Sequence, residues 1–355
     1  MPRSLVSSLL RRPLADPLSS SQNTGRDVSR ASLPAALIAL AAALTALFGI
    51  GLAQPNLPGL QYDEAADAVI AMEMILGQHP STLKTITLFG RDLPLMKQQH
   101  IGPTAIYINH VGLSLFGITV EAVRLTYLLV GALALALLWG LARLWFDDLT
   151  ALLVALLCGT APVFIWWGRT GAIWASQLLP ISLAMLITLW RWWQTGRAAW
   201  LLCGAFLFGF GVMSKIMFVW LAAPLGLMAL ALLWQARSRA FIFGTIRRVW
   251  FAGLLAMALG MLPLILHNVP NGDTIQFILG NASETRLYSH NNLAVLDNLR
   301  LVVSEFLRAI GGDTIYFQAP IIFPLSALAF AASAVYAAAR SVSDRHLVLA
   351  HTSHH

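Results

Sequence analysis

Two adjacent carboxylates, Asp63 and Glu64, follow the first long apolar run of the chain, and a third, Asp67, lies one helical turn further on. Only 11% of the residues are charged, so acids at the end of an apolar run stand out. Residues 61–77 fit a helix that begins after a turn rich in Pro and Gly. In that helix Asp63 and Asp67 share one face, whereas Glu64 is rotated by roughly 100°. Such carboxylates can act as general bases, although acids at a helix N-terminus also simply complement the helix dipole.

Basic residues that could serve the same chemistry also directly follow apolar runs. Arg169 and Lys215 each stand at the end of such a run. A cation at the membrane boundary suits the phosphate of a lipid carrier, whereas the alternative is that the side chain snorkels to the interface. Lys97 and His100 precede a Gly-Pro turn, where an imidazole could lie at the mouth of a cavity or simply belong to the turn.

The composition places the chain in a membrane. Of its 355 residues 58% are hydrophobic, and the mean hydropathy is +0.71. A soluble fold could not bury so much apolar surface, so we expect a polytopic membrane protein. Basic cytoplasmic loops explain the isoelectric point near 9.9, and we expect no nucleic-acid partner. The two cysteines, Cys158 and Cys203, lie in apolar runs without metal-ligand spacing, so no disulfide framework is expected.

Eight apolar runs have spanning length, and the expected fold class is therefore an all-α polytopic membrane protein with about eight transmembrane helices. The runs cover about residues 33–53, 123–145, 149–167, 173–193, 199–214, 216–234, 249–267 and 315–339. A further apolar segment, 103–116, is too short for a span. We predict that it forms a juxtamembrane helix in the first outer loop, as does the helix of residues 61–77.

The placement of arginine and lysine orients these spans. With the N-terminus in the cytoplasm, fourteen of the 23 basic residues lie in inner segments and nine lie outside. The positive-inside rule favours this orientation, and the arginines of residues 237–248 mark the clearest cytoplasmic loop. The chain then divides into a disordered cytoplasmic tail (1–31), a transmembrane domain (32–340) and a short cytoplasmic tail (341–355), and the long outer loops cover about 54–122 and 268–314.

Three segments together resemble the GT-C family of polytopic glycosyltransferases, which use a lipid-phosphate-linked sugar. Its members include the protein O-mannosyltransferases of glycosyltransferase family 39 and the aminoarabinose transferase that modifies lipid A. Tyr62-Asp63-Glu64-Ala65 is similar to the Asp-Glu motif after the first span. The run from His100-Ile-Gly-Pro103 through Leu115-Phe116-Gly117 to Ala122-Val-Arg124-Leu125 resembles the loop and helix that follow it. Gly211-Val-Met-Ser-Lys215 is similar to the family's Thr-Lys-Gly segment at the outer end of a helix.

The resemblance implies an inverting sugar transfer from a polyprenyl phosphate to a lipid, glycan or protein acceptor. Asp63 would be the catalytic base for the acceptor hydroxyl, and Glu64 would orient the acceptor or help to hold a divalent metal. No cofactor is expected to be required, and the use of a metal is left open. The expected substrate-binding residues are Lys215 and Arg169 at the carrier phosphate, together with His100, Lys97 and Asp67.

Three features depart from the family's pattern. Ser214-Lys215-Ile216 stands where members usually have Thr-Lys-Gly. The segment after the third span reads Arg169-Thr-Gly-Ala-Ile-Trp174, without the acid that many members carry there. The chain also ends about fifteen residues after its last predicted span. This ending leads us to expect that the acceptor-binding half of larger relatives is absent, truncated or supplied by a partner.

These observations predict a multi-pass enzyme of the inner (plasma) membrane with its active site on the periplasmic face. Two alternatives stay open: a transporter or flippase for lipid-linked sugars, and a truncated, non-catalytic relative. Transporters typically show charges at mid-membrane and inverted repeats. Here the charges cluster at the outer boundary, and no repeat is evident.

Overall fold

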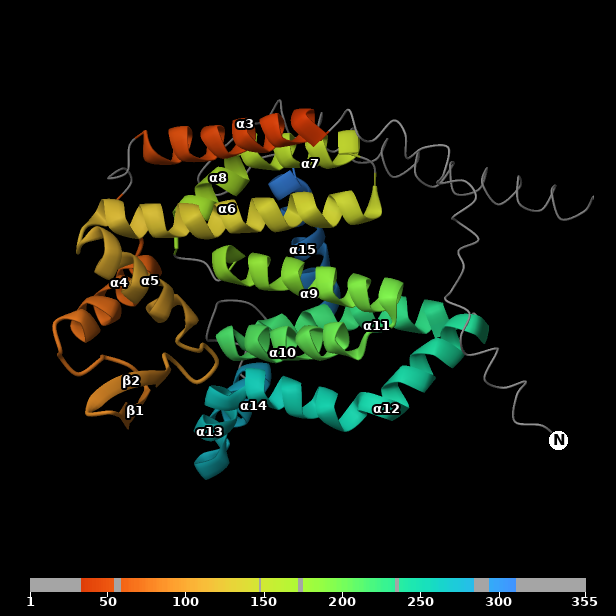
Figure 1. Ribbon diagram of the computed structural model, residues 1–355. Coiled ribbons are helices and arrows are strands. Elements are labelled where there is room, and N and C mark those ends of the chain that lie inside the picture. Colours follow the sequence, from red (N-terminus) through yellow and green to blue (C-terminus); the bar gives the residue numbers. More distant parts are fainter. Residues whose placement is uncertain are drawn as a thin grey trace, which may run out of the picture.

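The computed structural model describes residues 33–53, 59–146, 148–171, 175–233, 236–283 and 294–310. Within these ranges the chain is mostly helical, as predicted, and contains one β-hairpin (Figure 1). The two predicted tails and the predicted span 315–339 lie outside the described residues.

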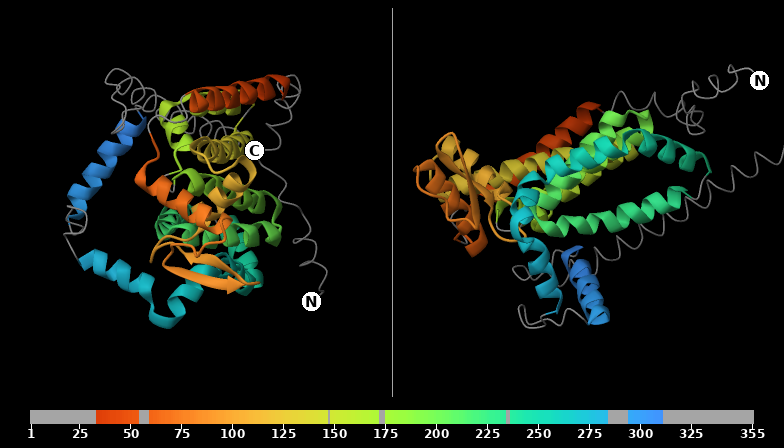
Figure 2. Two further views of the ribbon diagram at one scale, coloured as in Figure 1. Left: turned by 90° about the vertical axis from the view of Figure 1, so that its left-hand side faces the viewer. Right: turned by 90° about the horizontal axis from the view of Figure 1, so that it is seen from below.

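Helices that lie side by side form the body of the molecule (Figure 1). They are α3 (Leu33–Leu52), α6 (Val120–Trp145), α7 (Asp148–Thr160), α8 (Pro162–Arg169), α9 (Ala175–Thr195), α10 (Ala198–Ser214), the 3-10 helix η1 (Ile216–Leu221), α11 (Ala222–Leu233) and α12 (Ala236–Gly260). Smaller elements gather at one end, on the left of Figure 1. They are α4 (Tyr62–Ile75), α5 (Thr104–Phe116), β1 (Lys84–Leu88), β2 (Arg91–Met96), α13 (Leu262–Asn271) and α14 (Asp273–Ser283). We call this end the α4–α5 end. The amphipathic α15 (Val295–Ile310) lies apart from the body in both views of Figure 2.

Two described helices are long and apolar enough to cross a membrane, namely α6 and the Ile242–Gly260 part of α12. The prediction of eight full-length spans is therefore not confirmed. Proline explains part of the difference, because it ends or restarts a helix. The run 149–167 is interrupted before Pro162, and the run 249–267 is interrupted at Met261, shortly before Pro263. The run 216–234 begins as the 3-10 helix η1.

The two juxtamembrane helices predicted in the first outer loop are present. α4 begins after Gln61 and ends at Ile75, within the predicted 61–77. α5 coincides with the predicted segment except for its first residue, Pro103, which is the N-cap. A core of buried apolar side chains joins α4, α5 and the start of α6, and it includes Ile106 and Val123. This core fixes the first turn of α4 relative to the body.

The hairpin of β1 and β2 was not predicted from the sequence. Its two-residue turn consists of Phe89 (φ 52°) and Gly90 (φ 74°), and Ile86 pairs with Leu93 in the ladder. A turn with both central φ angles positive matches the right-handed twist of the strands. The left view of Figure 2 looks onto the α4–α5 end, where α4 and the hairpin cover the ends of the long helices.

Candidate active site

The first turn of α4 carries two adjacent carboxylates that lie in different surroundings. Asp63 is exposed and lines a pocket, whereas Glu64 is fully buried. The backbone N–H of Gln61 donates to Glu64 Oε2 at 3.2 Å. An acid at the third position of a helix that accepts this hydrogen bond reaches back over the helix start. Local sequence therefore directs Glu64 inward and leaves Asp63 facing outward.

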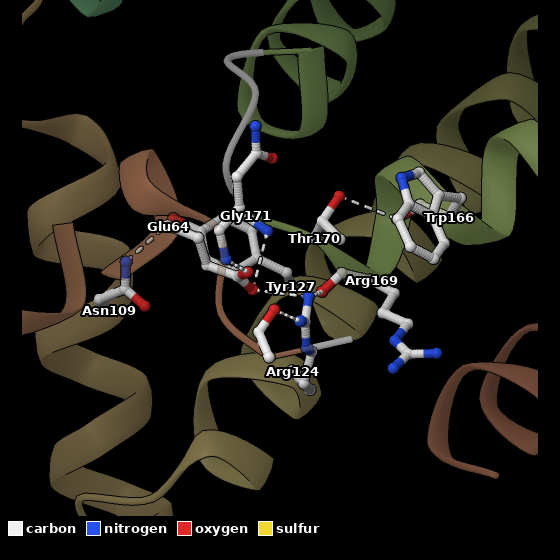
Figure 3. A network of polar contacts seen from close by, with 10 residues as sticks. Glu64, Asn109, Arg124, Tyr127, Trp166, Arg169, Thr170 and Gly171 are labelled. Atoms are coloured by element: carbon white, nitrogen blue, oxygen red, sulfur yellow. Dashed lines mark hydrogen bonds and ion pairs between the residues drawn. The ribbon is translucent and has the colours of Figure 1, made fainter. Parts of the chain in front are cut away.

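Glu64 forms an ion pair with Arg124 of α6 inside the protein (Figure 3). Glu64 Oε1 lies 2.8 Å from Arg124 Nη1, and both side chains are 0% exposed. Arg124 also donates to the carbonyl oxygens of Gly59 and Arg169, each at 3.4 Å. The backbone N–H of Gly171 donates to Glu64 Oε1 at 3.4 Å. Burial raises the pKa of Glu64, and the charge of Arg124 opposes this shift. The pair links the start of α4 to α6 and to the segment after α8.

A second polar contact supports the same region. Asn109 of α5 donates from Nδ2 to Tyr127 Oη at 3.0 Å and to the carbonyl of Ala105 at 3.0 Å. Asn109 is fully buried, as expected of a polar residue on the inner face of an apolar helix. A Cβ atom added to Gly171 would collide with the Tyr127 ring. The ring and Gly171 therefore fit closely, and the segment after α8 is held against α6.

A pocket of about 640 Å³ opens at the α4–α5 end, and we call it the polar pocket. One wall is polar and the other is apolar. The polar wall includes Asp63, Asp67, Lys97, His100, Gln177 and Lys215. The apolar wall comes from η1 and α14, and it includes Met217, Trp220, Phe277 and Ile278. Five of the seven predicted site residues thus line one pocket, although they come from three separate parts of the chain.

Lys97 and Asp67 are paired with each other across the floor of the polar pocket. Lys97 Nζ lies 2.7 Å from Asp67 Oδ1, and the two side chains are only 11% and 8% exposed. Burial raises the pKa of Asp67, and Lys97 opposes the shift through its charge and hydrogen bond. A nearly buried pair of this kind holds α4 to the segment of residues 97–102, which we call the loop segment.

Lys215 is held in an extended conformation between α10 and η1. Ile101 of the loop segment forms an antiparallel bridge with Lys215. The Gly102 N–H donates to the Ser214 carbonyl at 3.2 Å, and the Ile216 N–H donates to the His100 carbonyl at 3.1 Å. The backbone of the loop segment therefore positions the Lys215 side chain in the pocket. Burial lowers the pKa of Lys215 to about 7, the carboxylate of Asp63 opposes this shift, and Lys97 adds to it.

His100 lies flat against Phe277 of α14. The two rings stack with their centroids 4.5 Å apart and an interplanar angle of 5°. Burial lowers the pKa of His100, and the nearby charge of Lys215 lowers it further. The imidazole is therefore neutral near pH 7. Thr274 of α14 also donates to the Gln99 carbonyl at 2.5 Å, so α14 is fixed to the loop segment at two adjacent points.

The other two predicted site residues, Glu64 and Arg169, do not line the polar pocket. Glu64 faces Arg124, as described above. Arg169 is buried and contributes its backbone carbonyl to Arg124, while its guanidinium points away from that pair (Figure 3). The structure therefore brings Lys215 into the pocket wall without Arg169. Glu64 nevertheless accepts a hydrogen bond from Gly171, which does line the pocket, and Arg169 lies two residues before Gly171.

The arrangement suits an amphipathic anion. An accessible carboxylate, Asp63, and an ammonium group, Lys215, share the pocket with a wall of apolar side chains. Within the described ranges, no three His, Cys, Asp or Glu side chains are grouped so that they could hold a metal ion.

Sequence reasoning missed the apolar wall and the partner of Glu64. Phe277 and Ile278 lie in the second predicted outer loop, where no sequence pattern connects them to Asp63. Arg124 belongs to a motif that was noted, but its role became visible only in the structure. An arginine near the start of a long apolar helix could have served as a signal, because a buried cation requires a partner.

Comparison with known families gives a match over part of the chain. Residues 100–267 match the model of the dolichyl-phosphate-mannose-protein mannosyltransferase family. The match confirms the resemblance that the motifs indicated, and it includes His100, Arg124, Arg169 and Lys215. Asp63 lies before it. Neither the comparison with curated proteins nor the comparison with solved structures found a match.

Proposed function

We propose that this chain is a membrane glycosyltransferase that moves a sugar from a polyprenyl-phosphate carrier to an acceptor hydroxyl at the periplasmic face of the inner membrane. The observation that carries the proposal is that Asp63 and Lys215, far apart in the sequence, line the same pocket. The family match supports sugar transfer at a membrane as the general activity.

The two residues divide the reaction between them. Asp63 accepts the proton of the acceptor hydroxyl, whose oxygen then bonds to C1 of the sugar. The bond between C1 and the carrier phosphate breaks, and its electron pair stays on the phosphate oxygen. Lys215 stabilises this developing charge, which is the general role of a fixed cation at a leaving group. Because the acceptor attacks opposite the leaving group, the reaction inverts the anomeric centre.

The remaining predicted residues assist these two. The loop segment positions Lys215, and the Asp67–Lys97 pair holds that segment to α4. The neutral His100 offers a hydrogen bond to the sugar or phosphate. Glu64 acts as a positioning residue, since its ion pair with Arg124 fixes the turn that carries Asp63. Arg169 contributes through its backbone contact with Arg124.

The apolar wall explains how one pocket can bind a lipid-linked donor. Met217 and Trp220 on η1 are 48% and 72% exposed, so this wall is accessible from outside the body. In a bilayer it offers a path for the hydrocarbon chain while the phosphate lies at Lys215. A pocket whose lining combines polar and apolar side chains suits an amphipathic donor.

The test is genetic complementation followed by mass spectrometry of envelope glycans and lipids. Deletion of the gene should remove one glycan or lipid modification, and the intact gene should restore it. Asp63→Asn should fail to restore it while inserting normally into the membrane. Asp297→Asn, which changes an exposed acid on α15, should restore it fully. Full restoration by Asp63→Asn would overturn the mechanism.

A further inference from the structure

A second cavity at the α4–α5 end has a different character from the polar pocket. It measures about 800 Å³, and we call it the apolar cavity. The hairpin covers it on one side through Ile86, Leu88 and Leu93, which lie on one face of the ladder. The rest of its wall comes mainly from α5 and α6, with smaller contributions from α10 and α13.

The few polar side chains in its wall already have partners. Thr104 Oγ1 lies 2.7 Å from Ser214 Oγ, and Tyr107 Oη donates to the Pro94 carbonyl at 2.8 Å. Thr126 Oγ1 donates to the Ala122 carbonyl at 2.7 Å. A sugar, peptide or ion placed here would lose its hydrogen bonds to water and find no replacement. The lining therefore selects a hydrocarbon.

The shape of the cavity selects a chain rather than a compact molecule. Its lining follows the whole of α5, which at 1.5 Å per residue is about 20 Å long. It also continues along α6 as far as Leu133, and α6 is one of the two candidate membrane spans. Leu129 and Leu133 are 45% and 54% exposed, so the cavity opens sideways along this helix. In a bilayer that opening faces the lipid.

The backbone contact between Gly102 and Ser214, which we call the seam, separates the apolar cavity from the polar pocket. The Gly102 N–H donates to the Ser214 carbonyl, and Thr104 contacts Ser214 on the cavity side. A Cβ atom on Gly102 would collide with the Met213 carbonyl, so the seam is closely packed. The two cavities have no lining residue in common. A donor bound at Lys215 therefore cannot reach the apolar cavity through this seam.

We propose that the apolar cavity binds one hydrocarbon chain of a bilayer phospholipid beneath the hairpin, at a site separate from the donor. The apolar lining, the lateral opening along α6 and the seam beside Ser214 all support this occupant. The proposal does not depend on the glycosyltransferase activity, and its test requires no turnover.

The test is photolabelling in vesicles of phosphatidylethanolamine that contain a trace of a phospholipid with a diazirine on one acyl chain. The purified full chain is reconstituted and irradiated, and the labelled peptides are identified by mass spectrometry. Labels should concentrate on the hairpin, α5 and the first half of α6. Val130→Trp, which fills the cavity, should reduce this labelling at least several-fold. Leu153→Trp, an exposed site on α7 outside the cavity, should leave it unchanged.

Two outcomes would overturn the proposal. One is labelling that is spread evenly over the exposed faces of α6 and α7 and is unaffected by Val130→Trp. The other is loss of cavity labelling on addition of a polyprenyl phosphate, which would make the donor the occupant. If Val130→Trp is unstable by size-exclusion chromatography, Leu133→Trp at the rim provides the same measurement.

Discussion

At the residue scale, Asp63 and Glu64 are adjacent in the sequence but lie in different surroundings. Successive side chains of a helix differ by about 100° in direction, so one carboxylate faces the pocket and the other faces the interior. The sequence predicts Asp63 as the catalytic base and Glu64 as an assisting residue, and in the structure Glu64 has a buried cation as its partner. No pattern in the sequence joins residues 64 and 124, because that contact arises only when α4 packs on α6.

Breaking the Glu64–Arg124 pair should destabilise the protein strongly. Removal of one partner leaves the other charge buried without compensation, which typically costs about 3–5 kcal/mol. We expect Arg124→Met to lower the thermal unfolding temperature in detergent by several degrees or more. The double variant Glu64→Gln/Arg124→Met should recover most of that loss. Arg143→Met, which breaks the partly exposed pair with Asp148, serves as the control and should have a small effect.

If instead Glu64 acts directly on the substrate, the double variant Glu64→Gln/Arg124→Met would regain stability but would still fail to restore the glycan. Measuring unfolding temperature and glycan restoration on the same set of variants separates the two roles.

Donor binding should depend on pH near neutrality because burial places the pKa of Lys215 at about 7. The ammonium form, which attracts phosphate, is present below that pH and is lost above it. Donor affinity should therefore be highest below pH 7 and fall as pH rises, by up to about tenfold per pH unit for one coupled proton. Lys215→Arg should remove the dependence, since a guanidinium stays charged throughout. Donor affinity that stays constant between pH 6 and pH 9 in the unmodified protein would contradict this assignment.

At the scale of elements, the sequence predicted helices better than it predicted their connections. The helices at 61–77 and 103–116 were found within a few residues, because caps and apolar periodicity are local signals. The hairpin was missed because its turn places Phe89, rather than Asn or Asp, at a positive φ angle. In the loop segment the sequence singled out Lys97, His100 and the turn at Gly102 but not the contact with Lys215. The segment's bridge to Lys215 is a long-range backbone contact, and such contacts leave no local pattern.

The Asp67–Lys97 pair tests whether the loop segment positions Lys215. We expect Lys97→Met to raise the donor KM more than it lowers kcat, because the phosphate-binding lysine is displaced while Asp63 stays in place. The reversed pair Asp67→Lys/Lys97→Asp should recover part of the affinity, since it restores the link between α4 and the loop segment. Lys84→Met on the hairpin, outside the pocket lining, is the matched control and should leave both constants unchanged.

If Lys97 binds the phosphate directly, we expect the opposite order of donor affinities. In that case the reversed pair would bind donor even less well than Lys97→Met, because it places a carboxylate where the phosphate needs a cation. The comparison of the two variants therefore distinguishes a positioning residue from a substrate ligand.

At the scale of the whole molecule, hydropathy correctly predicted a mostly helical chain with apolar helices, whereas the eight spans are not confirmed and the orientation stays a prediction. The helices run back and forth, so the residues that surround the polar pocket collect at one end. α9 begins beside Gln177 of the pocket and ends at Thr195, and at 1.5 Å per residue its 21 residues extend about 30 Å. The connection between α9 and α10 therefore lies on the far side of a layer as thick as a bilayer core.

The predicted orientation can be tested on these two ends with single cysteines. In a protein whose Cys158 and Cys203 are replaced by alanine, Phe89→Cys at the fully exposed hairpin tip should react with a membrane-impermeant maleimide in cells with a permeabilised outer membrane. Thr195→Cys should react only after the inner membrane is also opened. This result is expected because the positive-inside rule predicts a cytoplasmic α9–α10 connection from basic residues such as Arg191 and Arg197. The reverse labelling pattern would place the polar pocket, and with it Asp63 and Lys215, on the cytoplasmic side, where a periplasmic acceptor could not reach them.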